Sequence, residues 1–126
     1  MPPSPLVYIV DDDAHVRNST VALLTAAGIA SSAYESGDAF LTALDASASG
    51  CVLLDLHMPN RTGFQILTSL REMGCPLPVI VFSGHTDAVT EGLVKKSGAV
   101  ALLRKPVLAA LLVASVRQAM GGNDLG

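Results

Sequence analysis

Short apolar runs alternate with segments of helical spacing along this chain. Four of these runs are unbroken and end at a polar or charged residue: 6–10, 51–54, 79–82 and 99–103. A run of this kind is typical of a strand buried on both faces of a parallel sheet. The more polar segment 29–34 alternates weakly and predicts a fifth strand at the edge of the sheet.

Five helices are expected between and after these strands, because apolar residues there recur three or four positions apart. They cover about residues 16–27, 36–44, 63–73, 87–96 and 107–120. Asp13 and Ser36 are expected N-caps, and Pro106 suits the first turn of the last helix. Thr62 and Gln65 fit a capping box that begins the third helix.

Two helices carry specific expectations about their inner faces. The third is expected to turn four apolar residues inward: Ile66, Leu67, Leu70 and Met73. The fourth has an apolar face of little more than Val89, Leu93 and Val94. Gly92 in its interior costs about 1 kcal/mol relative to alanine, so this helix is expected to be loosely held.

The alternation of strands and helices predicts an α/β fold. Such a chain forms a doubly wound parallel sheet with right-handed crossovers and helices on both faces. With five strands in the order 2-1-3-4-5, strands one and three are neighbours at the switch point of the sheet. Side chains at their carboxyl ends then face one crevice.

Length and composition limit the possible functions. The 126 residues suffice for one domain, and half of them are hydrophobic while 15% are charged, which excludes a disordered chain. A net charge of −3 provides no basic face, so we expect no direct contact with nucleic acid. No apolar stretch approaches the roughly 20 residues of a membrane span, and no secretory signal is evident. We therefore expect a cytoplasmic protein with two reduced cysteines and no membrane partner.

The ends of the predicted strands carry the candidate chemistry. Asp11 and Asp12 follow strand one, Asp55 strand three, Ser83 strand four and Lys105 strand five. Two carboxylates 4 Å apart repel by roughly 1 kcal/mol in water and by about 4 kcal/mol at an effective dielectric constant of 20. A cluster of three must take up protons or attract cations, and Mg²⁺ prefers carboxylate and water ligands.

With such an ion bound, Asp55 can act as a nucleophile toward a phosphoryl group and form an aspartyl phosphate. The metal and Lys105 would neutralise charge on the transferred group, and Ser83 could donate a hydrogen bond to it. Each residue alone is commonly a turn former or a solvated side chain. Their joint occurrence at four strand ends, in this order, favours the phosphoryl site.

These residues belong to four longer stretches with intact spacing. The stretches are Val-Tyr-Ile-Val-Asp-Asp-Asp at 7–13, Leu-Leu-Asp-Leu-His-Met-Pro-Asn-Arg-Thr-Gly at 53–63, Val-Ile-Val-Phe-Ser-Gly-His at 79–85 and Gly-Ala-Val-Ala-Leu-Leu-Arg-Lys-Pro at 98–106. In them the chain resembles the receiver domain of two-component response regulators, most closely the FixJ/NarL-like group. The resemblance covers about residues 6–120 and implies a flavodoxin-like (βα)₅ fold with the strand order 2-1-3-4-5. We expect a receiver domain at 1–120 and a flexible tail or linker start at 121–126.

The resemblance also implies a role for each site residue. Asp55 would accept the phosphoryl group from a histidine kinase. Asp12, Asp55 and the backbone carbonyl of His57 would bind Mg²⁺ directly, and Asp11 through water. Ser83 would be the switch hydroxyl and Lys105 the partner of the phosphoryl group. Switching would change the surface of helix four, strand five and helix five and so control a homodimer or an output domain.

The chain departs from the family pattern at three places. Leu102 stands where an aromatic switch residue is common, and Val107 where Phe is frequent. The last helix lacks the usual early acids and is apolar almost all round, which indicates burial on more than one side. We expect this helix to contribute to a dimer or output-domain contact. His57 and His85 either flank the phosphoryl group or are simply exposed loop residues.

Three other functions fit parts of the sequence. An aspartate-nucleophile phosphatase of the dehalogenase type places an acid two residues after the nucleophile, where this chain has His57. Flavin binding suits the same topology, but the loops lack an evident phosphate cradle. A degenerate receiver used only for protein contacts would have no need of the intact acid, hydroxyl and lysine set. The family also suggests a transcriptional output domain, which this chain does not contain; it would be a single-domain regulator or an excised receiver.

Overall fold

A computed structural model describes residues 5–45, 47–58, 62–84 and 87–121. Five parallel strands form one sheet in the order β2-β1-β3-β4-β5, which confirms the predicted fold class. The strands are β1 (Leu6–Val10), β2 (Ser31–Tyr34), β3 (Gly50–Asp55), β4 (Val79–Ser83) and β5 (Ala101–Arg104). The helices are α1 (Ala14–Ala26), α2 (Gly37–Ala43), α3 (Gly63–Glu72), α4 (Ala88–Lys96) and α5 (Ala109–Ala119). Among the described helices, none is long and apolar enough to cross a membrane.

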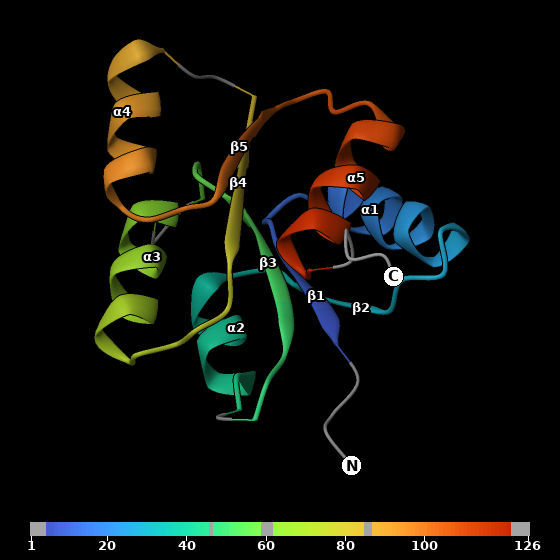
Figure 1. The fold of residues 1–126 in the computed structure, drawn as a ribbon, viewed down its shortest axis with the longest axis horizontal. Coiled ribbons are helices and arrows are strands. Elements are labelled where there is room, and N and C mark those ends of the chain that lie inside the picture. The colour runs from blue at the N-terminus through green and yellow to red at the C-terminus, as the bar shows by residue number, and fades with distance from the viewer. Residues whose placement is uncertain (1–4, 46, 59–61, 85–86, 122–126) are drawn as a thin grey trace.

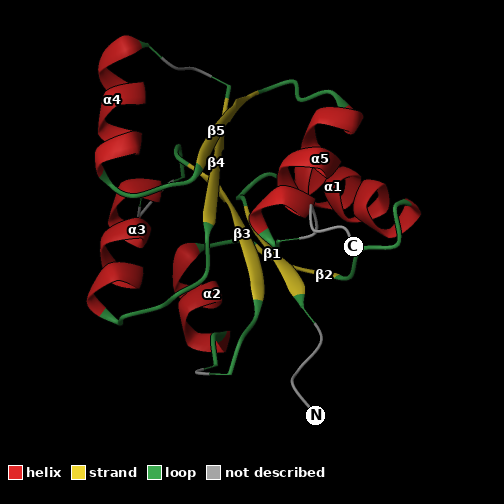
Figure 2. Ribbon diagram, viewed as in Figure 1, coloured by secondary structure: helices red, strands yellow, loops and turns green. Residues whose placement is uncertain are grey.

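The helices form two layers around the sheet. α1 and α5 cover one face, and α2, α3 and α4 cover the other (Figures 1 and 2). Because strand side chains alternate between faces, neighbouring residues of one strand enter different cores. Ile9 and Leu53 pack on the α1/α5 side, whereas Tyr8 and Leu54 pack on the α2/α3/α4 side. The central strands are therefore buried on both faces, as their unbroken apolar runs predicted.

The predicted caps of the first three helices are confirmed by their hydrogen bonds. The Asp13 carboxylate accepts from the backbone amides of His15 and Val16 and caps α1. Ser36 caps α2 in the same way. At α3, Thr62 and Gln65 form the full capping box, each side chain accepting from the other residue's amide.

Three apolar residues predicted to face inward are exposed instead. Met73 lies at the C-cap of α3, beyond its buried stripe, and is 54% exposed. In α4, Val89 is 73% exposed and Leu93 48% exposed, which leaves Val94 as the one buried residue of this helix. α4 thus rests on the core through a narrower contact than its sequence suggested.

The last strand and helix begin later than predicted. β5 starts at Ala101 rather than residue 99, although the Val100 amide already donates to the Val79 carbonyl at 2.8 Å. α5 starts at Ala109 rather than residue 107, so Pro106 lies before the helix and not in its first turn. The backbone is still extended at Leu108, while Val107 packs against the core on the α1/α5 side. The predicted tail at 122–126 lies outside the described residues.

Two glycines test how tightly the scaffold is packed. A Cβ on Gly63, at the start of α3, would lie 2.6 Å from the Asp55 carbonyl oxygen and 2.8 Å from Leu56 Cα. Gly63→Ala should therefore lower the free energy of unfolding by about 2 kcal/mol or more, because backbone atoms must move. Gly92→Ala, inside α4 with no atom within 4 Å, should raise it by about 1 kcal/mol. Urea unfolding measures both, and equal effects of the two changes would contradict this packing.

Candidate functional site

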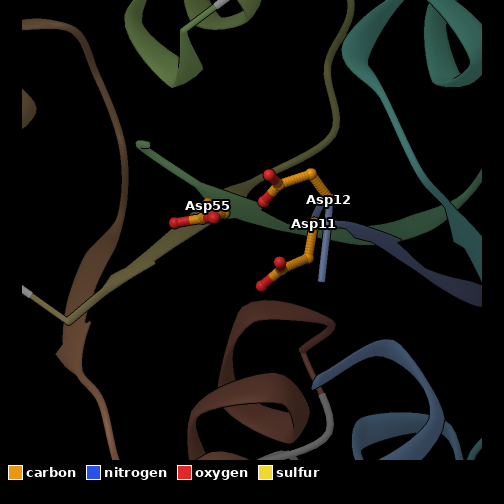
Figure 3. A group of neighbouring side chains, drawn as sticks. All are labelled: Asp11, Asp12 and Asp55. Carbon is orange, nitrogen blue, oxygen red and sulfur yellow. The ribbon is translucent and has the colours of Figure 1, made fainter. Parts of the chain in front are cut away.

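The charged residues at the strand ends lie together at the carboxyl edge of the sheet. β1 and β3 pair with Val10 beside Leu54, so Asp11 leaves the sheet next to Asp55. Carboxylate oxygens of Asp11, Asp12 and Asp55 all lie within 4.8 Å of one another. Figure 3 shows the three side chains meeting at this edge. We call these carboxylates, together with the Lys105 ammonium, the acidic site.

Asp11 is fully buried and has a protein partner on each carboxylate oxygen. Its Oδ1 accepts from the Asp13 backbone amide at 2.9 Å. Its Oδ2 accepts from Lys105 Nζ, also at 2.9 Å. The Asp11 carbonyl accepts from the Arg17 guanidinium of α1 at 2.8 Å, which fixes the turn after β1. Asp12, by contrast, is exposed at the mouth of the site.

Asp55 is the last residue of β3 and is only 4% exposed. Its Oδ1 accepts from the His57 backbone amide at 3.3 Å and lies 3.7 Å from Lys105 Nζ. Burial, followed by the negative charge of Asp11, raises the pKa of the Asp55 carboxyl, although the Lys105 charge acts in the opposite direction. Asp55 is therefore a carboxylate whose charge is poorly compensated by the protein alone.

Lys105 follows β5 and joins three strand ends. Its backbone amide donates to the Ser83 carbonyl at 2.9 Å, which ties it to the end of β4. Its ammonium reaches Asp11 and Asp55 across the edge of the sheet. The same ammonium lies 4.6 Å from the centre of the Phe82 ring.

The other predicted site residues lie at different depths. Ser83 is fully buried at the end of β4, one residue beyond Phe82, the neighbour of Asp55 in the sheet. The His57 residue is exposed while its amide contacts Asp55. Leu102 is half-buried and packs toward the α2/α3/α4 side, beside a cavity of about 270 Å³ between α4 and β5. His85 lies outside the described residues.

Two contacts of the site were not predicted from the sequence. Nothing in the spacing of Arg17 indicates that it would reach the Asp11 carbonyl. Phe82 was interpreted only as an apolar strand residue. Strand alternation could have placed Phe82 on the same face of β4 as Ile80, but it does not indicate the contact with Lys105.

The acidic site has the donors that a hard divalent cation requires. Three carboxylates converge, and two of them are held on rigid strand ends. Oxygen ligands in this number suit Mg²⁺, which keeps several waters and needs few carboxylates. Burial and then the charge of Asp11 raise the pKa of Asp55, and a nearby cation would oppose both effects by favouring the ionised carboxylate.

Comparison with known proteins assigns the chain to a family. The sequence model described as "Response regulator receiver domain" matches residues 7–117. The chain belongs to this family. Receiver domains are the phospho-accepting signalling modules of two-component systems, and the resemblance inferred from the four stretches is confirmed.

Similar proteins refine this assignment. The receiver is 35% identical over 117 residues to the transcriptional regulatory protein FixJ of Bradyrhizobium diazoefficiens, and 37% identical over 121 residues to FixJ of Azorhizobium caulinodans. These alignments cover 90% and 96% of the receiver but 57% of each relative, so the chain spans just over half of their length. The crystal structure of FixJ-N superposes with a TM-score of 0.86 at 31% identity and covers 98% of both chains.

The burial of Asp55 and its repulsion by Asp11 predict a pH-dependent stability. The native pKa of Asp55 is raised, so ionising Asp55 destabilises the folded receiver, and stability is lost as the pH rises through that native pKa. In EDTA at pH 7, Asp55→Asn should raise the free energy of unfolding by at least ~1 kcal/mol, the scale of neighbouring like charges. This difference should vanish as the pH falls below about 3.9, the ordinary Asp pKa. Urea titrations from pH 3 to 8 measure it, and a difference independent of pH would show that the ionisation of Asp55 is not its origin.

Proposed function

We propose that this receiver takes a phosphoryl group from a histidine kinase onto Asp55, in a reaction that requires Mg²⁺. The observation that carries the proposal is the acidic site, where a buried carboxylate lies beside two others and an ammonium. Asp12, Asp55 and the backbone carbonyl of His57 would hold the ion, and Asp11 would act through water. Bound there, Mg²⁺ supplies positive charge against the phosphoryl oxygens.

The hydrogen bonds of the acidic site support this division of roles. Both carboxylate oxygens of Asp11 already have protein partners, the Asp13 amide and the Lys105 ammonium, which favours an indirect role for Asp11. Asp12 is exposed and can turn its carboxylate toward an ion without leaving a buried partner unsatisfied. The exposed position of Asp12 also provides a path from solvent to the site.

The receiver's own groups account for the remaining steps. A carboxylate oxygen of Asp55 attacks phosphorus, and the bond between phosphorus and the donor's leaving group breaks. The His57 amide on Oδ1 orients the Asp55 carboxylate for this attack. Lys105 then balances charge on the new phosphoryl oxygens, and the Ser83 hydroxyl, on the neighbouring strand end, donates a hydrogen bond to one of them. These roles make Asp55, Ser83 and Lys105 the reactive set.

The other candidate functions have less support. A phosphatase of the dehalogenase type needs an acid two residues after its nucleophile, and His57 occupies that position. Receiver domains are signalling modules, which favours a switch over an enzyme acting on other molecules. Both FixJ relatives are named transcriptional regulatory proteins, so we extend the proposal to a transcriptional output domain and a cytoplasmic location. The division into a receiver at 1–120 and a tail or linker at 121–126 remains a prediction.

Phosphorylation can be measured directly on the intact chain. Incubation with acetyl phosphate and Mg²⁺ should add one phosphoryl group, detected by intact mass spectrometry. Asp55→Asn should abolish the gain because it removes the nucleophile, and EDTA should prevent it in the unchanged protein. Asp45→Asn, at an exposed acid between α2 and the amino end of β3, should leave it intact. A mass gain that survives in Asp55→Asn would assign the phosphoryl group to another residue.

Most of the exposed large apolar residues lie in the last third of the described chain. Five large ones lie on α4, at the entry to β5, or on α5: Val89, Leu93, Val100, Leu108 and Leu111. We call these five residues the α4–β5–α5 surface. The Arg104 guanidinium pairs with Glu91 and so links β5 to α4. A largely apolar, solvent-exposed α5 supports a role in homodimer or output-domain contacts after phosphorylation.

Dimerisation through this surface gives a second test of the switch. With Mg²⁺ and beryllofluoride as a phosphoryl mimic, the receiver should form a dimer in sedimentation velocity experiments. Leu111→Asp should weaken that dimer at least tenfold, because a carboxylate would be buried in the contact. Met73→Asp places the same charge on another exposed apolar residue and should leave dimerisation unchanged. A treated receiver that stays monomeric at high concentration would rule out the dimer.

A further inference from the structure

Besides the carboxylates of Asp11 and Asp55, the Lys105 ammonium has the Phe82 ring as a neighbour. The distance from Nζ to the ring centre is 4.6 Å, within the range of an attractive cation–π contact. Phe82 and Asp55 are direct neighbours in the parallel ladder of β3 and β4. Paired residues of parallel strands point to the same face, so the ring and the Asp55 carboxylate start from the same side of the sheet.

The ring holds the ammonium without neutralising it. Lys105 Nζ is 2.9 Å from Asp11 and 3.7 Å from Asp55, so the ion pair with Asp11 is the tighter one. A further carboxylate in the place of Phe82 would cancel the charge that the phosphoryl group needs. An aromatic face attracts the ammonium through its quadrupole and leaves the full positive charge in place.

An apolar cavity explains why such a hold is needed. A space of about 440 Å³ lies between α1 and the segment before α5, and both Phe82 and Lys105 line it together with Val107. The Lys105 side chain is about a quarter exposed, and it borders this open space. Loss of the ring face would let the stem turn into the cavity and carry the ammonium away from Asp55.

We infer that Phe82 is a positioning residue, which keeps the Lys105 ammonium within reach of both Asp11 and the phosphoryl group on Asp55. This inference rests on the proposed phosphorylation of Asp55. It goes beyond that proposal, because it assigns a role to an apolar strand residue that touches neither the phosphoryl group nor the ion. It also predicts that the electrostatics of the ring, and not only its volume, set the rate of phosphorylation.

Fluorinated phenylalanines at position 82 separate these two contributions. Monofluoro, difluoro and trifluoro rings keep nearly the same size while the negative charge of the ring face falls stepwise. The rate of phosphorylation by acetyl phosphate with Mg²⁺ should fall in the same order, by about two- to fivefold at the trifluoro ring. Phosphorylation of the Phe82→Leu receiver should be at least as slow as that of the trifluoro receiver. Urea unfolding should show that every receiver of the fluorinated series is still folded under the conditions of the rate measurement, so that a slower rate does not come from unfolding.

The same substitutions at Phe40 provide the matched control. Phe40 is a fully buried aromatic residue on the α2/α3/α4 side and packs against Tyr8 and Tyr34. Fluorination there should leave the rate unchanged. A fall of equal size at Phe40, or a rate that does not respond to fluorine at Phe82, would overturn the inference while leaving the proposed function standing.

A second readout does not depend on phosphorylation. In NMR spectra, the ring current of Phe82 should shift the ε-methylene protons of Lys105 upfield, and Phe82→Leu should remove this shift. Ordinary lysine shifts in the unchanged receiver would show that the contact is absent and overturn the inference. A protein that acetyl phosphate never modifies, but whose Lys105 protons are shifted, would instead disprove the proposed function and leave the contact itself established.

Discussion

The concentration of like charge at one edge of the sheet is the constraint on which the rest of the structure depends. Parallel pairing carries Asp11, next to Asp12, and Asp55 to the same edge, and their carboxylates meet within 4.8 Å. Such a cluster is stable only if cations enter it, and Lys105 is the one that the end of β5 provides. Burial, and after it the charge of Asp11, raises the pKa of Asp55 despite the opposing charge of Lys105. A site with this excess of negative charge favours a divalent cation and a reaction that requires one.

The scaffold around this site is rigid at the centre and weakly held at one side. The central strands are buried on both faces, and Gly63 packs directly against the backbone of Asp55 and Leu56. α4, in contrast, contributes only Val94 to the core among its described residues. Polar contacts supplement this packing, including the pair of Glu91 with Arg104 and the bond from Arg71 to the carbonyl of Ser97 at the end of α4. Such an element can change position at low energetic cost.

Together, these properties suit a phosphorylation switch. A phosphoryl group on Asp55 would add negative charge where the protein already has too much, so the surrounding cations and donors must rearrange. Lys105 and Ser83 lie at strand ends next to the weakly held side. The Lys105 amide donates a hydrogen bond to the Ser83 carbonyl and so links the two ends. The apolar α4–β5–α5 surface lies on that side. A local electrostatic event at the acidic site thus has a short path to a surface suited to binding a partner.

Local patterns in the sequence were enough to predict the five strands, the helix caps and the residues at the strand ends, because apolar periodicity and capping depend on neighbours within a few positions. The convergence of the carboxylates also followed, once the alternation indicated a parallel sheet and the resemblance to receiver domains implied its strand order. The exposure of Met73 and Val89, the late start of α5, and the contacts of Arg17 and Phe82 did not follow. Each of these depends on which distant segment packs against the residue, and Lys105 meets Phe82 only because β4 and β5 are paired. Contacts between segments far apart in the sequence are set by the folded core as a whole, so only the tertiary structure could decide them.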